Sequence, residues 1–222
     1  MAVKVVAFDV YDTLARWPDD HVAPIEVQRL LARFGVEISY QAYEAARHYV
    51  LFFDSVARRI EGWTDFLALV FGRMNTPISV DLLTSLTAVY ERRARMTPFD
   101  DALPAIEAAG KAGLRTCAFT TLPEFMFRHG GSRILSALDH YFDGAAIGLP
   151  KGHPRFYRRI TETLGVAPPD ILCVGDDPIC DIELPADAGW RTVHLVRSGR
   201  PPGSGERTIA SLSDVTRYFN DA

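Results

Sequence analysis

Short apolar runs alternate with amphipathic stretches from residue 98 to residue 198, and this alternation constrains the fold more than any other feature of the chain. Near-continuous apolar runs are typical of strands covered on both faces, as in a parallel sheet. The predicted strands are residues 4–8, 114–119, 171–174 and 191–196, with a weaker candidate at 144–148. Helical patterns at 102–112 and 153–164 separate them, and Asp100 and Asp101 are placed to cap the first of these helices. The sequence therefore predicts an α/β fold with a Rossmann-like, doubly wound parallel sheet.

Residues 16–97 do not follow this alternation. They contain helical patterns at 25–34, 40–60, 64–71 and 80–95. A separate N-terminal domain would cut the strand at 4–8 off from its sheet, whereas an insertion after that strand would not. We therefore predict a Rossmann-like core made of residues 1–15 and 98–222, and an inserted all-helical cap domain made of residues 16–97.

Composition excludes several classes of function. The net charge of −4 argues against a basic nucleic-acid-binding face, and no apolar run approaches the roughly 18 residues of a membrane span. Three cysteines without metal-type spacing, in a chain without a secretion signal, predict reduced thiols and a cytoplasmic protein. We expect a small-molecule substrate as the partner, and a monomer or a homodimer.

Charged side chains gather where the predicted strands end, which is where a parallel sheet places its active site. They are Asp9, Asp12, Lys151, Asp176, Asp177 and Asp181. Several carboxylates within a few ångströms cannot all stay ionised without a cation, and one lysine is not enough. A hard divalent ion with oxygen ligands, Mg²⁺ by preference, is the expected cofactor.

Four segments in this order resemble the motifs of the haloacid dehalogenase-like hydrolases. FDVYDTL at 8–14 closely resembles their first motif, Thr120 their second, Lys151 before a helix their third, and VGDDPICDI at 174–182 their fourth. The resemblance covers residues 3–14 and 98–198. The cap matches only in position, length and helical character.

The resemblance implies a catalytic role for each matching residue. Asp9 would be the nucleophile and would form a covalent aspartyl intermediate that water then hydrolyses. Thr120 would donate a hydrogen bond to an oxygen of the transferring group. Lys151 would keep Asp9 ionised and neutralise the charge that develops during the reaction.

The resemblance also implies the metal site. Asp176 would bind Mg²⁺ together with Asp9 and the backbone carbonyl of Tyr11. Asp177 and Asp181 would complete the site through water or through Lys151.

Tyr11 departs from the phosphatase pattern of the family. Phosphatases carry a second Asp at this catalytic position, which protonates the leaving oxygen and later activates water. The family's 2-haloacid dehalogenases have Tyr there, because a halide leaves without a proton, but they work without metal and have Ser at the position of Asp176. Without a cation, Asp176 and Asp177 would repel an anionic haloacid and raise the pKa of Asp9.

The acidic motif therefore favours a hydrolase that is a Mg²⁺-dependent phosphatase of a small phosphorylated metabolite. A 2-haloacid dehalogenase is the alternative. A third hypothesis is a catalytically lapsed member of the family that binds a phosphorylated ligand.

Four further residues are candidates for contact with the substrate. They are Arg16, His21, Arg47 and Thr121. The aromatic residues of the cap follow helical spacing, and we interpret them as its hydrophobic core rather than as a ligand site. The cap residues that face the site should decide which substrate is accepted.

Overall fold

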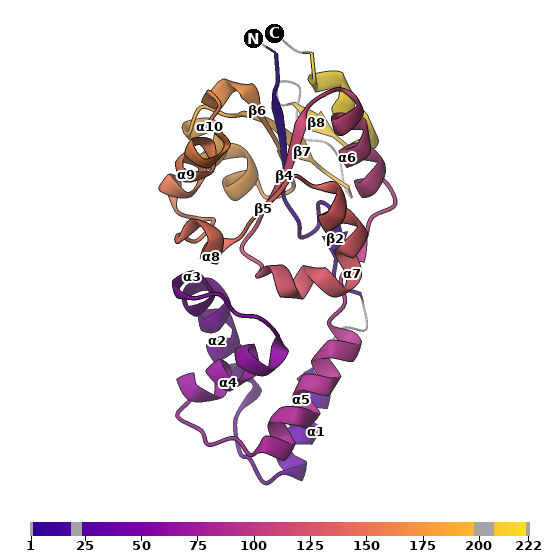
Figure 1. Cartoon of the computed structure of the whole chain (residues 1–222). Coiled ribbons are helices and arrows are strands. Elements are labelled where there is room, and N and C mark those ends of the chain that lie inside the picture. The colour runs from indigo at the N-terminus through magenta and orange to yellow at the C-terminus, as the bar shows by residue number, and fades with distance from the viewer. Residues whose placement is uncertain (1, 19–23, 198–206, 221–222) are drawn as a thin grey trace.

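Six parallel strands form the central sheet of the computed structural model, which describes residues 2–18, 24–197 and 207–220 (Figure 1). In spatial order the strands are β5 (His140–Phe142), β4 (Arg115–Phe119), β1 (Val5–Phe8), β6 (Ile171–Gly175), β7 (Arg191–Leu195) and β8 (Thr208–Ile209). The first strand of the chain lies between β4 and β6, which come far later in the sequence. The predicted α/β fold with a doubly wound parallel sheet is confirmed.

Helices cover both faces of this sheet, as the continuous apolar strands require. Val6 and Phe8 of β1 belong to the cluster that includes α6 (Ala102–Lys111), α7 (Glu124–Ala137) and the 3₁₀ helix η4 (Leu212–Tyr218). Val5 and Ala7 point to the opposite face and join the cluster formed with α9 (Pro154–Leu164). In Figure 1, α9 and α6 accordingly lie on opposite sides of the strands.

Local signals define α9 in the expected way. Pro154 occupies the first turn, and the imidazole of His153 accepts a hydrogen bond from the backbone N–H of Arg155. Gly165 ends the helix in the left-handed region, at φ 64°, where glycine carries no steric penalty. Because this helix starts at residue 154, Lys151 lies in the turn just before it.

Two local predictions are wrong. Residues 144–148 are not a strand: Asp143 accepts a hydrogen bond from the N–H of Ala146 and starts the short helix α8 (Gly144–Ile147). The strand at this edge is β5, immediately upstream. Asp101 does not cap α6 with its side chain, because its carboxylate instead accepts hydrogen bonds from Arg197, Ser211 and the N–H of Leu212.

The segment between residues 17 and 96 is mainly helical and lies below the sheet in Figure 1. Its helices are α1 (Pro24–Arg33), α2 (Tyr40–Tyr49), the π-helical turn η1 (Val50–Asp54), α3 (Ser55–Ala57), α4 (Trp63–Arg73) and α5 (Val80–Arg93). Buried aromatic side chains such as Tyr43, Phe66 and Phe71 fill the space between them. Across the parts of the chain that the structure describes, no helix is long and apolar enough to cross a membrane.

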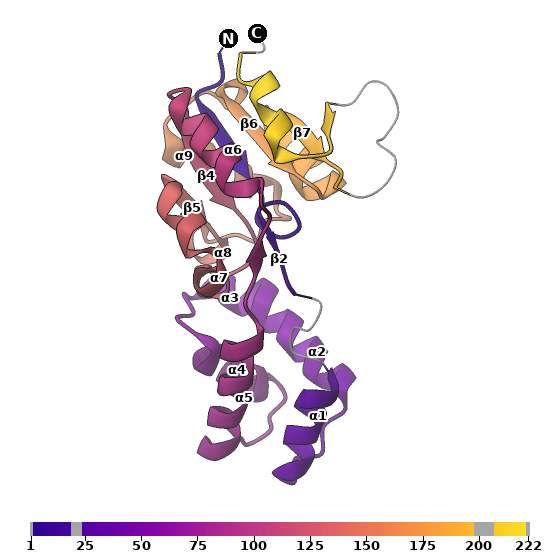
Figure 2. The same cartoon turned by 90° about the vertical axis from the view of Figure 1, so that its right-hand side faces the viewer.

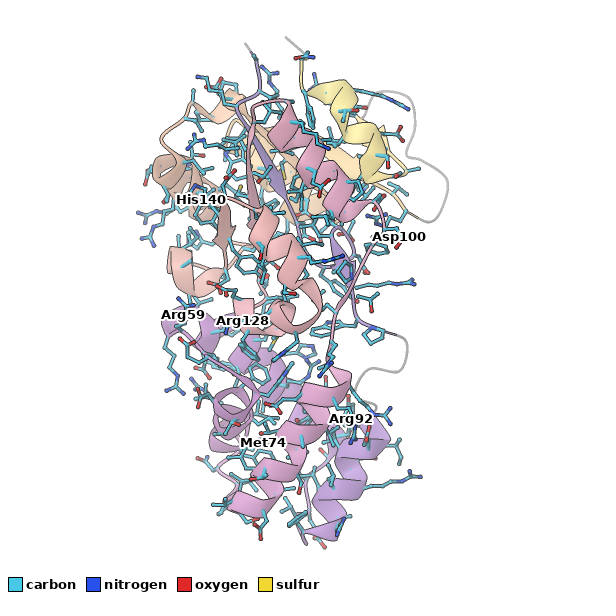
Figure 3. The ribbon with its side chains drawn as sticks, turned by 45° about the vertical axis from the view of Figure 1, so that its right-hand side comes forward. Arg59, Met74, Arg92, Asp100, Arg128 and His140 are labelled. Carbon is cyan, nitrogen blue, oxygen red and sulfur yellow. The ribbon has the colours of Figure 1, made fainter. Side chains whose placement is uncertain are left out.

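The chain enters and leaves this helical segment through two short paired strands. β2 (Ala15–Arg16) and β3 (Thr97–Pro98) form an antiparallel pair, which Figure 2 shows between the helices and the main sheet. An ion pair also joins the two parts: Arg59, just after α3, contacts Glu124 at the start of α7. Glu124 also pairs with Arg128, and Figure 3 shows Arg59 and Arg128 near one another at this boundary.

The packing of α7 against the segment that leads into β3 generates a prediction. A Cβ atom on Gly130 would lie 1.7 Å from the carbonyl oxygen of Met96, so Gly130→Ala forces the backbone apart. We expect the free energy of unfolding to fall by about 1–3 kcal/mol. Gly110→Ala on α6 is the control, because a Cβ there meets nothing within 4 Å and should stabilise the helix by about 0.5–1 kcal/mol. Urea denaturation of both variants checks this, and equal effects would contradict it.

Candidate active site

The ends of neighbouring strands bring the candidate catalytic residues together. Asp9 follows β1, Thr120 follows β4 and Asp176 follows β6. Backbone hydrogen bonds hold the first two in line with the sheet: the N–H of Asp9 donates to Val174, and the N–H of Thr120 donates to Phe142, each at 2.9 Å. Residues separated by more than 160 positions thereby share one edge of the sheet.

Lys151 is buried between two carboxylates. Its side chain is 8% exposed, and its Nζ lies 2.5 Å from Oδ1 of Asp9 and 2.7 Å from Oδ1 of Asp181. Burial alone would lower the pKa of Lys151, but the charges of Asp9 and Asp181 and their hydrogen bonds hold it well above its usual value. Lys151 is therefore a permanent cation at this edge.

Asp181 is fully buried and is held from two directions. Besides contacting Lys151, its carboxylate accepts a hydrogen bond of 2.9 Å from the N–H of Asp177. Gly175, at the end of β6, makes room for it, because a Cβ there would lie 2.3 Å from the Asp181 carboxylate. The glycine of this motif is thus required by close approach rather than by backbone conformation.

One lysine does not balance the acidic groups at this edge. Burial raises the pKa of Asp9 to about 8, against the opposing effect of Lys151, and the charge of Asp181 adds to the rise. Burial and the charge of Asp181 also raise the pKa of Asp176 to about 6. A positive charge in addition to that of Lys151 would stabilise the ionised forms of these carboxylates.

The donor set fits a hard divalent cation. Carboxylate oxygens of Asp9, Asp176 and Asp181 all lie within 4.8 Å of one another, and hard divalent ions prefer oxygen ligands of this kind. Asp177, also predicted as a ligand, uses Oδ1 to accept hydrogen bonds from the N–H groups of Ile179 and Cys180, and so caps the turn that follows. Of the residues predicted to hold the metal, the structure brings the carboxylates of Asp9, Asp176 and Asp181 together.

Arg197 holds the loop that follows β1 in place through hydrogen bonds to its backbone. Its guanidinium donates hydrogen bonds to the carbonyls of Asp12 and Thr13, pairs with Asp101 and lies over the ring of Phe99. Asp12 takes a left-handed conformation, at φ 57°, which Asp tolerates better than most residues. The hydroxyl of Thr13 donates to Asp176 over 3.1 Å and so links this loop to the end of β6.

A pocket of about 610 Å³ opens over these residues, between the sheet edge and the helical segment. On the sheet side its walls include Asp9, Tyr11, Thr120, Thr121, Leu122, Lys151, Asp176, Asp177, Cys180 and Asp181. On the helical side they are Trp17, Tyr40, Glu44, Arg47, His48, Leu51, Phe52, Trp63, Tyr90 and Ala94. Tyr11 is 44% exposed. Its partial burial raises the pKa of the phenol above the usual value for tyrosine, and the charges of Asp12 and Asp176 add to the rise.

The predicted substrate contacts have different outcomes. Thr121 and Arg47 line the pocket. Arg16 does not: it lies exposed on β2, near the ring of Phe99. His21 falls outside the described residues.

Sequence reasoning missed part of the helical wall. Trp63, one of the cap aromatic residues interpreted above as core, lines the pocket, and so do Tyr40, Glu44 and Tyr90. The i, i+4, i+7 spacing of Tyr40, Glu44 and Arg47 marks one face of a helix, and that spacing was the available signal. No described residue accepts a hydrogen bond from the buried indole N–H of Trp63.

The burial of Lys151 generates a prediction. Lys151→Met keeps the unbranched shape and most of the length of the side chain but leaves Asp9 and Asp181 without their shared cation. Because removing one partner of a buried ion pair is strongly destabilising, we expect the free energy of unfolding to fall by about 3–5 kcal/mol. Urea denaturation in the presence of EDTA measures it. Lys111→Met, at the exposed end of α6, is the control and should stay within about 0.5 kcal/mol of the wild type; a similar value for the two variants would contradict the prediction.

Comparisons with known proteins agree with this geometry. Residues 3–189 match the family described as haloacid dehalogenase-like hydrolase. The enolase-phosphatase E1 of Nocardia farcinica is 32% identical over 124 residues, which make up 53% of this chain and 53% of that protein. The chain thus matches about half the length of this curated relative.

Solved structures of two activities share the fold. A 2-haloacid dehalogenase from Pseudomonas syringae superimposes with a TM-score of 0.68 and a phosphatase from Thermococcus onnurineus with 0.65. Each is 18% identical, with 97% of both chains covered. Because the family match spans most of the chain and the carboxylate-rich edge of a doubly wound sheet lies within it, this protein belongs to the haloacid dehalogenase-like hydrolases and is a hydrolase.

Proposed function

We propose that this hydrolase is a Mg²⁺-dependent phosphatase that acts on a small phosphate monoester through a covalent intermediate on Asp9. The observation that carries the proposal is the cluster of three carboxylates, from Asp9, Asp176 and Asp181, beside the buried side chain of Lys151. Such a site favours a divalent cation, and together with Lys151 the cation would attract a phosphoryl dianion. The similarity to enolase-phosphatases adds support.

In the proposed reaction, the Asp9 carboxylate attacks phosphorus and the ester P–O bond breaks, releasing the leaving group with its oxygen. Water then attacks the phosphorus of the aspartyl phosphate, the P–O bond to Asp9 breaks, and inorganic phosphate leaves. Bound Mg²⁺ would supply positive charge opposite the phosphoryl oxygens, held by Asp9, Asp176 and Asp181.

Two side chains would orient the phosphoryl group. Thr120 already accepts a hydrogen bond from the N–H of Leu122, so its hydroxyl hydrogen is available to donate to a phosphoryl oxygen. Lys151 opposes the rise in the pKa of Asp9 that burial causes and, together with bound Mg²⁺, would keep Asp9 ionised; it would also offset charge that builds up as the P–O bond breaks.

Tyr11 favours a second candidate, 2-haloacid dehalogenation, in which Asp9 would attack the carbon that bears the halogen and expel halide. This reaction needs no acid at position 11. Its substrate is a carboxylate, however, and five acidic residues line the pocket. Of the described residues that line it, the lysine and arginine side chains are Lys151 and Arg47, and both are engaged in ion pairs. A catalytically lapsed member that binds a phosphorylated ligand is the third hypothesis.

An assay of two products separates these candidates. We expect the wild type to release phosphate from a panel of phosphate esters with Mg²⁺ and not with EDTA, and to release no chloride from 2-chloropropionate. Asp9→Asn, which is nearly isosteric, should abolish phosphate release while the circular dichroism spectrum stays unchanged. Chloride release without metal would favour the dehalogenase, and the absence of either product would favour the lapsed member.

Tyr11 allows a test of leaving-group dependence. A phenol with a pKa above about 10 is a poor proton donor at neutral pH, so the wild type should hydrolyse aryl and acyl phosphates faster than alkyl phosphates. Tyr11→Asp supplies a carboxyl group at the same position. Since general acid–base catalysis typically contributes about 10²–10⁴-fold, it should raise kcat for alkyl phosphates more than for aryl phosphates.

Tyr11→Phe is the matched control, and it should keep the aryl-phosphate rate of the wild type. If Tyr11→Asp slows both kinds of ester, the phenol has a positive role of its own and this part of the proposal is wrong.

A further inference from the structure

Among the described residues, half of those on the helical wall of the pocket carry phenylalanine, tyrosine or tryptophan side chains. Trp17, Tyr40, Phe52, Trp63 and Tyr90 all contribute to it. The rings of Trp63 and Tyr90 pack against one another with centroids 4.7 Å apart, and Trp63 itself is only 4% exposed. A wall of fixed rings opposite the phosphoryl site favours a flat, apolar group in the intervening space.

The one cation on this wall is already neutralised, as far as the described residues go. Nε and Nη2 of Arg47 donate to the two carboxylate oxygens of Glu44 over 2.8–3.1 Å, in the bidentate geometry that makes such pairs strong. Burial pushes the pKa of Glu44 upward, but the hydrogen bonds and charge of Arg47 hold it below its usual value. The pair therefore presents no net charge to the pocket at neutral pH.

Among the described residues, the rest of the pocket offers no unpaired lysine or arginine to a second anion. Lys151 is committed to Asp9 and Asp181 at the sheet edge. Asp176 and Asp177 add further negative charge. A carboxylate or second phosphate on the leaving group would lose its hydration without gaining an unpaired cation, which is costly.

We propose that the leaving group of the substrate is an uncharged aromatic group that packs against the wall formed by Trp17, Tyr40, Phe52, Trp63 and Tyr90, and that Glu44 sets this preference by neutralising Arg47. The proposal rests on the proposed phosphatase function and names the class of its substrate: a monoester of phosphate with a neutral phenol. Arg47, predicted from the sequence as a substrate contact, then acts as half of a neutral pair rather than as an anchor for an anion.

The sheet side of the pocket leads to the same class independently. With Tyr11 at the position of the acid, the site is suited to a leaving group that departs without a proton, and phenols are far better leaving groups of this kind than aliphatic alcohols. The aromatic wall favours a phenol as the leaving group, and the lack of a carboxylic acid at position 11 is compatible with one.

Phosphonates test this without turnover, because their C–P bond is not hydrolysed. The dissociation constants of benzylphosphonate, 4-carboxybenzylphosphonate, cyclohexylmethylphosphonate and inorganic phosphate are measured by titration calorimetry on the wild type with Mg²⁺. We expect benzylphosphonate to bind about 2- to 10-fold more tightly than the cyclohexyl analogue, which lacks a flat ring. The 4-carboxy derivative should bind at least about tenfold more weakly than benzylphosphonate.

Glu44→Gln tests the role of the pair. It leaves Arg47 without its counter-charge, so affinity for 4-carboxybenzylphosphonate should rise at least about tenfold while affinity for benzylphosphonate stays within about twofold. A structural role alone would change both ligands together. Glu91→Gln, an exposed residue of α5 that does not line the pocket, is the matched control and should change neither.

Each outcome has a distinct meaning. If inorganic phosphate and benzylphosphonate both fail to bind with Mg²⁺, the proposed function fails and this proposal fails with it. If they bind but the 4-carboxy ligand binds the wild type equally well or better, Arg47 is an anion anchor and only the leaving-group proposal is overturned. That comparison uses the wild type, so it holds even if Glu44→Gln does not fold; a folded Glu44→Gln with an unchanged affinity ratio removes Glu44 as the determinant.

Discussion

The contact of Lys151 with Asp9 and Asp181 imposes a strict requirement on the fold. Three charged groups are buried together at the edge of the sheet, and groups of this kind are tolerated only when their partners are held in place. The requirement extends outward from the contact. Gly175 must lack a side chain so that Asp181 can approach, and α9 must begin where it does so that Lys151 precedes it.

The same contact explains why the site calls for more positive charge. Lys151 forms ion pairs with one oxygen of Asp9 and one of Asp181, but among the described residues the carboxylate of Asp176 accepts a hydrogen bond only from the hydroxyl of Thr13. Burial raises the pKa of Asp9 and of Asp176, and the charge of Asp181 adds to both rises. A divalent cation would balance the excess negative charge and so allow a phosphoryl dianion to approach this edge, which is why metal and substrate class are linked in the proposed function.

Sequence reasoning reached the sheet because buried parallel strands carry a strong and local signal. It placed Asp9, Thr120 and Asp176 at one edge, since parallel strands end together. It failed where two local signals competed, as at Asp143, whose capping of α8 outweighs the apolar character of residues 144–148. It also gave Asp101 a local role, whereas the carboxylate bonds to Arg197 and Leu212 about a hundred residues away. Distant pairings of this kind leave no periodic pattern in the sequence, and for the same reason the role of Trp63 at the pocket could not be separated from core packing.

The pairing of β2 with β3 has a consequence for how this molecule can change over evolutionary time. Ala15 lies opposite Pro98 and Arg16 opposite Thr97, so the chain leaves the sheet and returns to it at neighbouring points. Everything between these points can lengthen, shorten or be replaced without altering the register of β1 with β4 and β6. The residues that would carry out phosphoryl transfer therefore lie on the sheet, and most of those that would recognise the leaving group lie on the inserted helical segment. Substitutions in the helical segment could change which substrate binds while the residues at the sheet edge stay the same.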